Sequence, residues 1–335
     1  MSKLSIIMPV FNAEKFLREA IDSIIDQSFT NWELLIINDG STDSSESIIQ
    51  SYTDKRIQYY KNDQNIGLIS TLNKGIGLCT GNYIARMDAD DISEKDRFKA
   101  QLAFLEKNED YAMCGSYAKV IDENNNETGK ILNLQTNDFL QINLLFSVPF
   151  IHPSMMFRSK VLKNNYFDPE YKHAEDYELW CRIANNYKIA NIPDYLLRYR
   201  WHMNNVSVTY SEIQENIKNK IICRELQNIE LQPSEKELRL HKITFQQFEA
   251  KAKIEKQKFE YYSQLDSWFR KIIDSNKKKQ KYNESSLIAF LWSRWIVLCI
   301  SQKKYSKICK PKFASYKLSI LYKTFNLLLF LNKKA

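Results

Sequence analysis

The sequence predicts an α/β protein: a Rossmann-type, mostly parallel sheet with helices on both faces, followed by a helical C-terminal region. Short runs rich in β-branched and aromatic residues alternate with helical patterns over the first part of the chain. These runs are almost wholly apolar, as expected for strands that are buried on both faces. From about residue 211 the pattern is helical and lysine-rich, with little glycine or proline.

Residues 1–95 are expected to hold four strands with helices between them. A helix over residues 13–27 places Leu17, Ile21 and Ile24 on one apolar face. A second helix begins after DGSTDSSE, where serine and aspartate supply the caps. Crossovers of this kind place ligands at the carboxyl ends of the strands. The strands read LSIIMPV, WELLIIND, RIQYYKN and NYIARMD.

Residues 96–210 mix helix and strand less regularly, as expected for an acceptor-binding half. An amphipathic helix over residues 96–107 precedes the strand-like YAMCGSYAKVID, and a helix is expected around NDFLQINLLFS. The segments FIHPSMMFR, HAEDYELWCRIANNY and the extended KIANIPDYLLRYRWH follow. We therefore predict one domain over residues 1–210, with halves 1–95 and 96–210, and a basic helical region over residues 211–335.

Charge separates the same two parts. Residues 211–335 hold 26 Lys and Arg against 12 Asp and Glu, a net charge of +14, which leaves −6 for residues 1–210. The 44% hydrophobic content is that of a globular rather than a disordered protein. The six cysteines are scattered with no CxxC pair, and the apolar run near the N-terminus is too short for a signal peptide. We expect reduced thiols and a cytoplasmic location.

Two enzyme classes with parallel sheets are disfavoured. Dinucleotide-binding and P-loop enzymes cradle phosphates in a glycine-rich turn after a strand. The turn after the first strand reads PVFNAEK and contains no glycine, while the only glycine cluster, GIGLCTG, precedes a strand. NAD binding and Walker-type ATP binding are therefore not expected, and a diphosphate would need a metal ion held by carboxylates.

Acidic residues follow two of the predicted strands. Asp39 follows the second strand, and Asp88, Asp90 and Asp91 follow the fourth. In extended backbone Asp88 and Asp90 would project to the same side. Carboxylate oxygens suit Mg²⁺ or Mn²⁺, which make such clustered negative charge tolerable. A D-x-D string alone is weak, and its position at the end of a buried strand is what makes it informative.

Four ordered motifs in residues 3–210 resemble the family 2 glycosyltransferases, which have the GT-A fold. They are SIIMPVFNAEKFL, NWELLIINDGSTDSS, NIGLISTLNKGI and GNYIARMDADD. The resemblance implies inverting, metal-dependent transfer of a hexosyl or N-acetylhexosaminyl group from a nucleotide sugar, most often a UDP-sugar. It assigns residues 1–95 to the nucleotide sugar and implies a glycan or lipid-linked acceptor in envelope polysaccharide synthesis.

The resemblance also implies roles for individual residues. Asp39 would bond the uracil ring, and Asp88 and Asp90 would touch ribose and metal. Asp39 could instead cap the following turn, Asp91 is expected to be a helix cap rather than a ligand, and Arg86 either pairs with a neighbouring carboxylate or faces the diphosphate. The remaining residues expected around the nucleotide sugar are Pro9, Val10, Phe11, Asn12, Glu14, Asn65, Gly67 and Ala89.

The segment HAEDYELWCRI supplies a candidate general base. If a helix begins near Asp176, this carboxylate lies on the inward face with Leu179 and Trp180, close to helix amides that favour its charged form. The alternative is an ordinary helix N-cap. As general base Asp176 would take the proton of an acceptor hydroxyl. The Glu-Asp pair matches the base motif of the family, so Asp176 is predicted to be the base, with Glu175 in support.

Four further residues are weaker candidates. His202, in YRWHMNNVS, is expected to complete the metal site that Asp90 begins. Arg198 and Arg200 either offset the charge of the diphosphate or lie on the surface. His152 resembles a family position near the acceptor, although an isolated histidine is more often a core residue. His173 and His241 have no supporting context.

The C-terminal region predicts an amphipathic helix. KLSILYKTFNLLLFLNKK places Leu318, Leu321, Tyr322, Phe325, Leu328 and Leu329 on one face with lysines at both ends, which fits an anionic membrane surface. Helices that pack on the main domain are the alternative. The window SSLIAFLWSRWIVLCI is short of the ~20 residues of a membrane span and contains Arg294. No nucleic-acid partner is expected, and the protein is predicted to be cytoplasmic or peripheral on the cytoplasmic face of the membrane.

Two rival functions stay open. One is a catalytically silent module that binds sugar nucleotides or glycans within a membrane assembly complex. The other is a nucleotidyltransferase, which would normally carry a glycine- and basic-rich loop after its first strand. The sequence does not identify the sugar, the acceptor or the oligomeric state.

Overall fold

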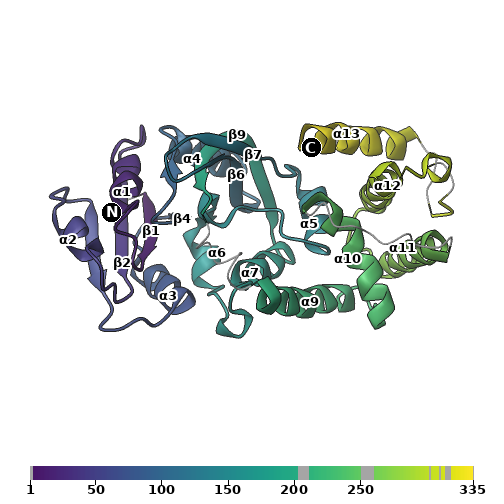
Figure 1. Cartoon of the computed structure of the whole chain (residues 1–335), viewed down its shortest axis with the longest axis horizontal. Coiled ribbons are helices and arrows are strands. Elements are labelled where there is room, and N and C mark those ends of the chain that lie inside the picture. Colours follow the sequence, from purple (N-terminus) through teal and green to yellow (C-terminus); the bar gives the residue numbers. More distant parts are fainter. Residues whose placement is uncertain are drawn as a thin grey trace. The chain divides into compact units, whose positions relative to one another are not determined.

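The structure is a computed structural model that describes residues 3–202, 211–249, 260–301, 303–308, 311–313 and 318–334. The chain forms two compact units (Figure 1). Unit 1 contains Met1–Asn137 and Pro149–Ile217, and unit 2 contains Asp138–Val148 and Lys218–Ala335. The segment Asp138–Val148, which we had expected in the acceptor half, therefore joins the C-terminal helices. The predicted domain boundary near residue 210 stays a prediction.

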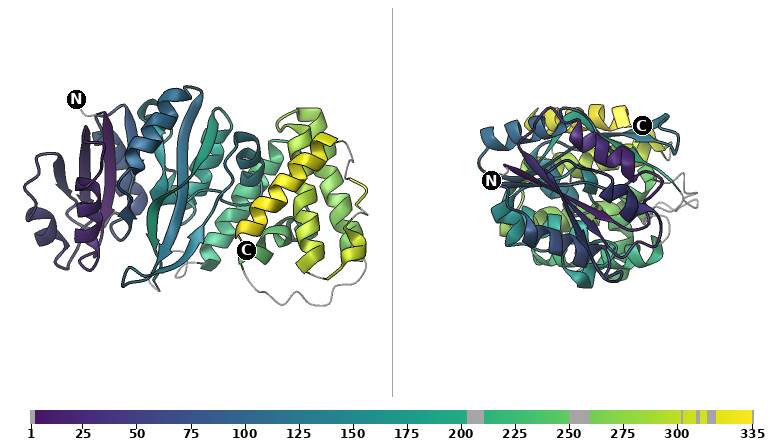
Figure 2. Two further views of the ribbon diagram at one scale, coloured as in Figure 1. Left: turned by 90° about the horizontal axis from the view of Figure 1, so that it is seen from above. Right: turned by 90° about the vertical axis from the view of Figure 1, so that its left-hand side faces the viewer.

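Unit 1 contains one large mixed sheet, shown from two further sides in Figure 2. Its order is β3-β2-β1-β4-β8-β6-β9-β5, with β7 paired to β6. The strands β1, β2, β3 and β4 are parallel to one another, and β6 is parallel to β9, whereas β8, β5 and β7 run antiparallel to their neighbours. The strands are β1 Leu4–Val10, β2 Trp32–Asn38, β3 Ile57–Lys61, β4 Tyr83–Arg86, β5 Ile92–Ser93, β6 Tyr111–Ile121, β7 Glu127–Ile131, β8 Met156–Arg158 and β9 Lys188–Arg200.

Helices cover both faces of this sheet, as the sequence predicts (Figure 1). Along β1, Leu4, Ile6 and Met8 pack in one core with α1 and α4, while Ile7 faces the other way, toward Gly75 of α3. This alternation is the two-residue period of a strand that is buried on both sides. The helices of unit 1 are α1 Leu17–Ile25, α2 Ser45–Gln50, α3 Leu68–Leu78, α4 Arg97–Lys107, α6 Ser159–Lys163 and α7 Glu175–Ala184, with one-turn segments η1 His152–Ser154 and η2 Pro169–Tyr171.

Unit 2 is helical, and its centre is α12. Most residues of α12 are buried, including Trp292 and Trp295, although by length and composition alone this helix could cross a membrane. Since 67% of the apolar segment Glu284–Ser301 is buried inside the protein, we interpret α12 as a core helix. The helices that contribute to this unit are α5 Asn137–Leu144, α9 Ser211–Gln227, α10 Glu235–Glu249, α11 Glu260–Lys279, α12 Glu284–Ser301 and α13 Leu318–Lys334, with η3 Tyr305–Lys307.

A buried histidine fixes Asp138–Val148 to these helices. His241 of α10 is fully buried, and its Nε2 lies 2.8 Å from the carbonyl oxygen of Leu145. Its Nδ1 accepts a hydrogen bond of 3.3 Å from Trp268 Nε1, and its ring stacks on Phe146 at 4.1 Å between centroids. Burial lowers the pKa of His241 to about 4. His241, for which the sequence offered no context, is therefore a neutral structural residue.

Candidate active site

Three loops meet at one edge of the sheet because β1, β2 and β4 are parallel and end on the same side. The loop after β1 is tied to the loop after β2: Asn12 Oδ1 accepts from the amide of Thr42 at 2.9 Å, and Glu14 Oε2 accepts from the amide of Ser44 at 2.8 Å. The Phe11 side chain, at the start of this loop, is 49% exposed. Pro9 and Val10 form the last part of β1. The predicted nucleoside-side residues thus lie together at the carboxyl end of β1, where Val10 is buried and Phe11 is exposed.

Asp39 does not cap the turn that follows β2. Asn38 takes that role, because its Oδ1 accepts from the amide of Ser41 at 2.8 Å. The buried Asp39 carboxylate instead accepts from the amides of Ile66 and Gly67, both at 2.9 Å, and from Asn62 Nδ2 at 2.8 Å. The turn-cap alternative is therefore wrong. Asp39 holds the loop before α3 against the end of β2.

Two glycines make this close approach possible. Gly67 has φ 88° and Gly40 has φ 73°, values that L side chains rarely adopt. A Cβ atom on Gly40 would lie 2.8 Å from the amide nitrogen of Asn65. Asn65 Oδ1 in turn accepts from the amide of Gly67 at 3.0 Å. The predicted positions Asp39, Asn65 and Gly67 therefore belong to one hydrogen-bonded loop.

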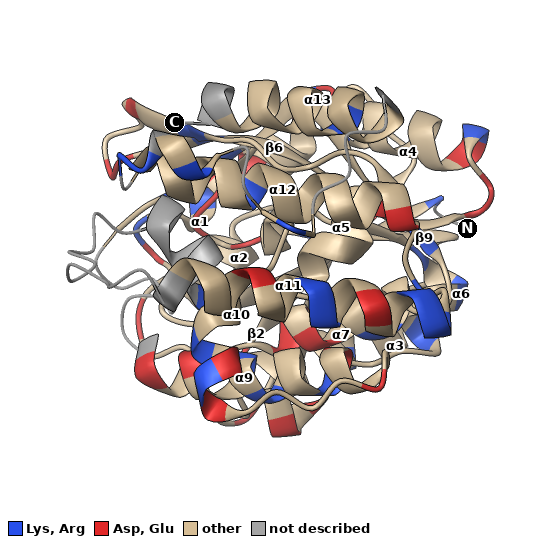
Figure 3. Cartoon of the chain, turned by 90° about the vertical axis from the view of Figure 1, so that its right-hand side faces the viewer, with Lys and Arg blue, Asp and Glu red and all other residues tan. Residues whose placement is uncertain are grey.

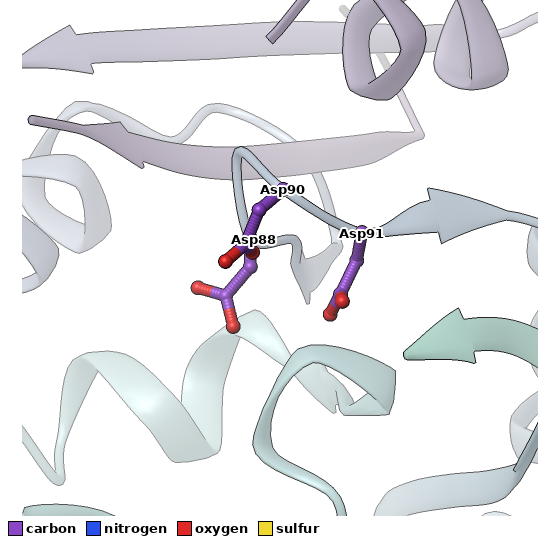
Figure 4. Close-up of side chains that lie close together, drawn as sticks. All are labelled: Asp88, Asp90 and Asp91. Atoms are coloured by element: carbon purple, nitrogen blue, oxygen red, sulfur yellow. The ribbon is translucent and has the colours of Figure 1, made fainter. Parts of the chain in front are cut away.

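The three acids after β4 form a tight cluster, which we call the acid turn (Asp88, Asp90 and Asp91; Figure 4). One ligand atom from each lies within 4.8 Å of the others. We had expected an extended backbone to align Asp88 with Asp90, whereas β4 ends at Arg86 and a turn brings these side chains together. The predicted pair, Asp88 and Asp90, is therefore close in space because of a turn and not because of an extended strand. Ala89, between them, is buried.

Basic residues surround the acid turn. The buried Arg86 forms an ion pair with Asp88, so of its two predicted alternatives the carboxylate pair is the one observed. His202 Nε2 lies 3.0 Å from Asp90 Oδ2, and the His202 ring stacks on Phe16 at 5.9 Å. Burial raises the pKa of Asp88 even though Arg86 opposes the shift. The positive charge of Arg86 therefore does not fully offset the effect of burial on the Asp88 carboxylate.

Asp91 is not a helix cap, because the N-cap of α4 is Asp96. The Asp91 carboxylate is buried, and its Oδ1 accepts from the amide of Arg200 at 2.8 Å. Its Oδ2 has no hydrogen-bond partner among the residues that the structure describes. Burial, together with the charge of Asp90, raises the pKa of Asp91 well above its usual value. The expectation of a cap is therefore wrong, and Asp91 is a third acid of the cluster.

Sequence reasoning missed Arg97, which is fully buried in the first turn of α4. Its guanidinium donates to the carbonyl oxygen of Arg86 at 2.8 Å and to Gln101 Oε1 at 3.1 Å. Burial lowers the pKa of Arg97 to about 9, so it remains a cation at neutral pH near the acid turn. The signal was available, because Arg97, Gln101 and Leu105 follow a four-residue spacing on the buried face of this helix.

The predicted base lies at the start of α7. This helix begins at Glu175 with Ala174 as its N-cap, so the N-cap alternative for Asp176 is wrong. Asp176 is half-buried, and its Oδ1 accepts from the amide of Tyr177 at 2.7 Å. Glu175 is buried, and burial, aided by the charge of Asp176, raises the pKa of Glu175 to about 7. Two adjacent carboxyl groups therefore differ in environment.

The weaker candidates fall in three places. Arg198 pairs with Glu94 at 2.8 Å and is 41% exposed along its side chain. Arg200 is fully buried and donates to the carbonyl oxygens of Asp90 at 2.7 Å and Asp122 at 2.9 Å, so it holds the acid turn against β9. His152 packs on Phe167 and Trp180, and its buried Nε2 has no hydrogen-bond partner within the described part of the chain.

The donor set of the acid turn fits a hard divalent cation. Three carboxylates and one imidazole converge, and one carboxylate oxygen, Asp91 Oδ2, is buried with its hydrogen-bonding capacity unused within the described ranges. Mg²⁺ and Mn²⁺ bind through one or two carboxylates together with substrate phosphate, and imidazole is acceptable to Mn²⁺. The residues present could therefore hold either ion.

Comparison with known proteins identifies the family of the chain. The model of the family described as Glycosyl transferase family 2 matches residues 5–166. An uncharacterized glycosyltransferase of Haemophilus influenzae is 37% identical over 231 residues, which cover 65% of this chain and 71% of that protein. The amylovoran biosynthesis glycosyltransferase AmsE of Erwinia amylovora is 30% identical over 202 residues, covering 58% of this chain and 75% of that protein.

The fold also has a counterpart among solved structures. The crystal structure of S. aureus TarS in complex with UDP-GlcNAc matches with a TM-score of 0.59 at 18% identity, covering 99% of this chain and 92% of that chain. This likeness shows a shared GT-A-like fold. The family model and the sequence relatives together show that the chain belongs to glycosyltransferase family 2 and is a transferase enzyme.

Proposed function

We propose that this glycosyltransferase moves a sugar, with inversion, from a UDP-sugar to a hydroxyl group of a glycan or glycolipid, and that it depends on Mg²⁺ or Mn²⁺. The observation that carries the proposal is the acid turn at the carboxyl end of β4, beside the loops that follow β1 and β2. Ligands of open α/β sheets bind at this edge.

The nucleoside is assigned to the rim formed by Phe11 and the Asp39 loop. Phe11 offers an exposed aromatic face for the base, and Asp39 lies 2.9 Å from two backbone amides that fix its carboxylate at the sheet edge. Pro9, Val10, Asn65 and Gly67 border the same loops. The proposal of a uridine nucleotide is consistent with the complex of S. aureus TarS with UDP-GlcNAc.

The diphosphate is assigned to the acid turn. A divalent ion held by Asp88, Asp90 and His202 would offset the negative charge that develops on the departing nucleoside diphosphate. Arg86 stays paired with Asp88 and keeps this carboxylate oriented. Arg97 and Arg200 bind carbonyl oxygens of the same segment, at 2.8 Å and 2.7 Å, and keep the turn in place.

Asp176 is assigned as the general base. It takes the proton of the acceptor hydroxyl while the acceptor oxygen forms a bond to the anomeric carbon, and the bond from that carbon to the diphosphate oxygen breaks with its electron pair. Burial raises the pKa of Glu175 to about 7, and the protonated form of this neighbour does not repel the Asp176 carboxylate. An α-linked donor would give a β-glycoside.

The proposed acceptor rests on a sequence relative and on the surroundings of His152. The relative from Erwinia amylovora is named for amylovoran biosynthesis, and this relationship supports the proposed role in envelope polysaccharide synthesis. His152, with its unused buried Nε2 near Trp180, is a candidate contact on the acceptor side. A silent binding module is the second candidate function, and the intact acid turn and Asp176 argue against it.

Measurement of UDP release tests the proposal. The purified chain is incubated with a panel of UDP-sugars in the presence of Mn²⁺, in the presence of Mg²⁺ and in excess chelator. We expect release above background for at least one donor, and its loss on chelation. Donor binding without release under every condition would favour the silent module, and release of sugar 1-phosphate in place of UDP would indicate nucleotidyl transfer.

A further inference from the structure

The last helix of unit 2, α13, has two different apolar faces. Ile320, Leu327 and Leu331 are 3–5% exposed and follow the spacing of one helical stripe, and α13 packs on α12 (Figure 1). The other stripe points outward, and we call it the α13 outer face. Its members are Leu321, Tyr322, Phe325 and Leu329, which are 38%, 67%, 59% and 48% exposed.

An exposed stripe of four large apolar residues at helical spacing is unusual. Single exposed apolar side chains are normal on protein surfaces, but a contiguous group marks an interaction site. The sequence pattern predicts Leu318, Leu328 and these four residues on one face. The structure separates the two apolar sides, because it shows which stripe the protein core already covers. The α13 outer face is therefore not needed for packing within the described part of unit 2.

The C-terminal sequence segment that contains α13 carries positive charge only. From Ser285 to Ala335 the chain holds nine Lys and one Arg but no Asp or Glu. Lys303, Lys304 and Lys312, between α12 and α13, are exposed. Lys317 directly precedes α13, and Lys333 and Lys334 are its last residues. Figure 3 shows lysine and arginine on the helices of unit 2.

We propose that the α13 outer face binds the surface of an anionic lipid bilayer, with the helix axis in the plane of the membrane. An apolar stripe flanked by lysines matches this environment, since the stripe enters the acyl boundary while the cations meet lipid phosphates. A second copy of the chain is a poorer occupant, because it would bring two strongly basic, acid-free segments together. The attachment is peripheral, because the apolar side chains of α12 are mostly buried in unit 2.

Vesicle sedimentation with the full chain tests this surface. The probes are vesicles of phosphatidylcholine alone and of phosphatidylcholine with about 30% phosphatidylglycerol, at about 0.05 M and about 0.5 M NaCl. We expect the chain to bind the anionic vesicles at low salt, to bind the neutral vesicles at least about tenfold more weakly, and to lose most of its binding at high salt.

Matched variants distinguish binding through the α13 outer face from nonspecific binding through other exposed apolar residues. Tyr322→Ser with Phe325→Ser should weaken binding to anionic vesicles at least about tenfold, since two large apolar side chains leave the bilayer boundary. Ile213→Ser with Tyr187→Ser removes two other exposed apolar residues, 52% and 41% exposed, and should leave binding unchanged. Circular dichroism and urea unfolding of both double variants report whether the chain remains folded, and neither measurement depends on lipid or on catalytic activity.

Three outcomes would overturn the proposal. They are equal binding to neutral and anionic vesicles, no binding at all, and unchanged binding by the Tyr322/Phe325 variant. Sedimentation without vesicles tests the second copy, because a concentration-dependent dimer that the same double variant abolishes, with no vesicle binding, would assign the α13 outer face to self-association. The lipid result is independent of the proposed catalytic function, so either can fail without the other.

Discussion

Two buried polar groups in this molecule have opposite surroundings. In unit 2, His241 has both ring nitrogens within hydrogen-bond distance of a partner, Leu145 O on one side and Trp268 on the other. In unit 1, the acid turn gathers three carboxylates within 4.8 Å, and Asp91 Oδ2 finds no partner among the described residues. The fold satisfies every polar atom of the first group, whereas it leaves hydrogen-bonding capacity unused in the second.

The difference separates a structural role from a functional one. A buried polar group whose hydrogen bonds are all made stabilises one packing arrangement, while an unsatisfied cluster costs free energy that the fold must supply elsewhere. Clusters of the second kind concentrate at functional sites. Mutation should therefore affect the two groups in opposite ways, with activity changing at the acid turn and stability changing at His241.

The largest effect is expected at Asp90. Asp90→Asn should lower kcat/KM for UDP release by about 10³-fold, because the cluster loses a charged oxygen ligand for the divalent ion. The free energy of unfolding should stay the same or rise, since repulsion within the acid turn falls. Steady-state kinetics and urea unfolding measure the two quantities. Asp110→Asn, at an exposed acid paired with Lys188, is the control. Loss of stability with intact activity would contradict the comparison.

A smaller loss of activity is expected at the predicted base. Asp176→Asn should reduce kcat at least a hundredfold, within the range of about 10²- to 10⁴-fold for general base catalysis, and leave donor binding nearly unchanged. Single-turnover kinetics with a donor titration separates binding from chemistry. Glu170→Gln, at an exposed acid of η2, serves as the matched control. Full turnover in Asp176→Asn would remove the base assignment.

At His241 the effect should fall on stability. His241→Ala removes a fully buried ring and leaves the carbonyl of Leu145 and the indole of Trp268 unpaired, which should destabilise unit 2 by about 2–3 kcal/mol. Hydrogen exchange in α10 and α11 reports on this unit directly. Arg239→Ala, on the same helix but 79% exposed along its side chain, should cost less than about 0.5 kcal/mol. Equal effects of the two variants would rule out the structural role.

The smallest effect is a pH dependence with a defined sign. The folded-state pKa of His241 is about 4, below the unfolded value of about 6.5, so the folded unit binds fewer protons. Its stabilising contribution is complete above about pH 6.5 and is lost as the pH falls toward 4, with about 2 kcal/mol gone at pH 5. In unit 1 the pKa of Glu175 is raised to about 7, so the folded state binds more protons than the unfolded state. The contribution of Glu175 to stability therefore falls as the pH rises toward 7, which is opposite to that of His241.

The His241→Phe variant isolates this dependence. Hydrogen exchange in α10 and α11 at pH 7 and pH 5, corrected for the intrinsic exchange rate, should show the loss in the wild-type chain and not in the variant. The same slope in both chains would mean that another group of unit 2 titrates in this range.

Several features of the site were predicted because they depend on neighbours in the sequence. Apolar runs that end in Asp39 and in Asp88 predicted the strands β2 and β4 and the acids at their carboxyl ends, and the parallel order follows from the helices between them. Asp91 was misassigned, because its role depends on a contact with the amide of Arg200 that no local pattern encodes. For Arg97 the local spacing indicates burial, but it does not reveal the hydrogen bond to the carbonyl of Arg86.

In unit 2, too, some features follow from the sequence alone and others only from the tertiary structure. The sequence by itself determined that α13 is an amphipathic helix flanked by lysines, since a spacing of three and four residues is a local property. Only the tertiary structure decided which apolar stripe meets α12 and which stays exposed, and that His241 holds Asp138–Val148 in this unit. Periodicity fixes the direction of side chains around one helix axis, whereas burial depends on what else the chain brings to that face.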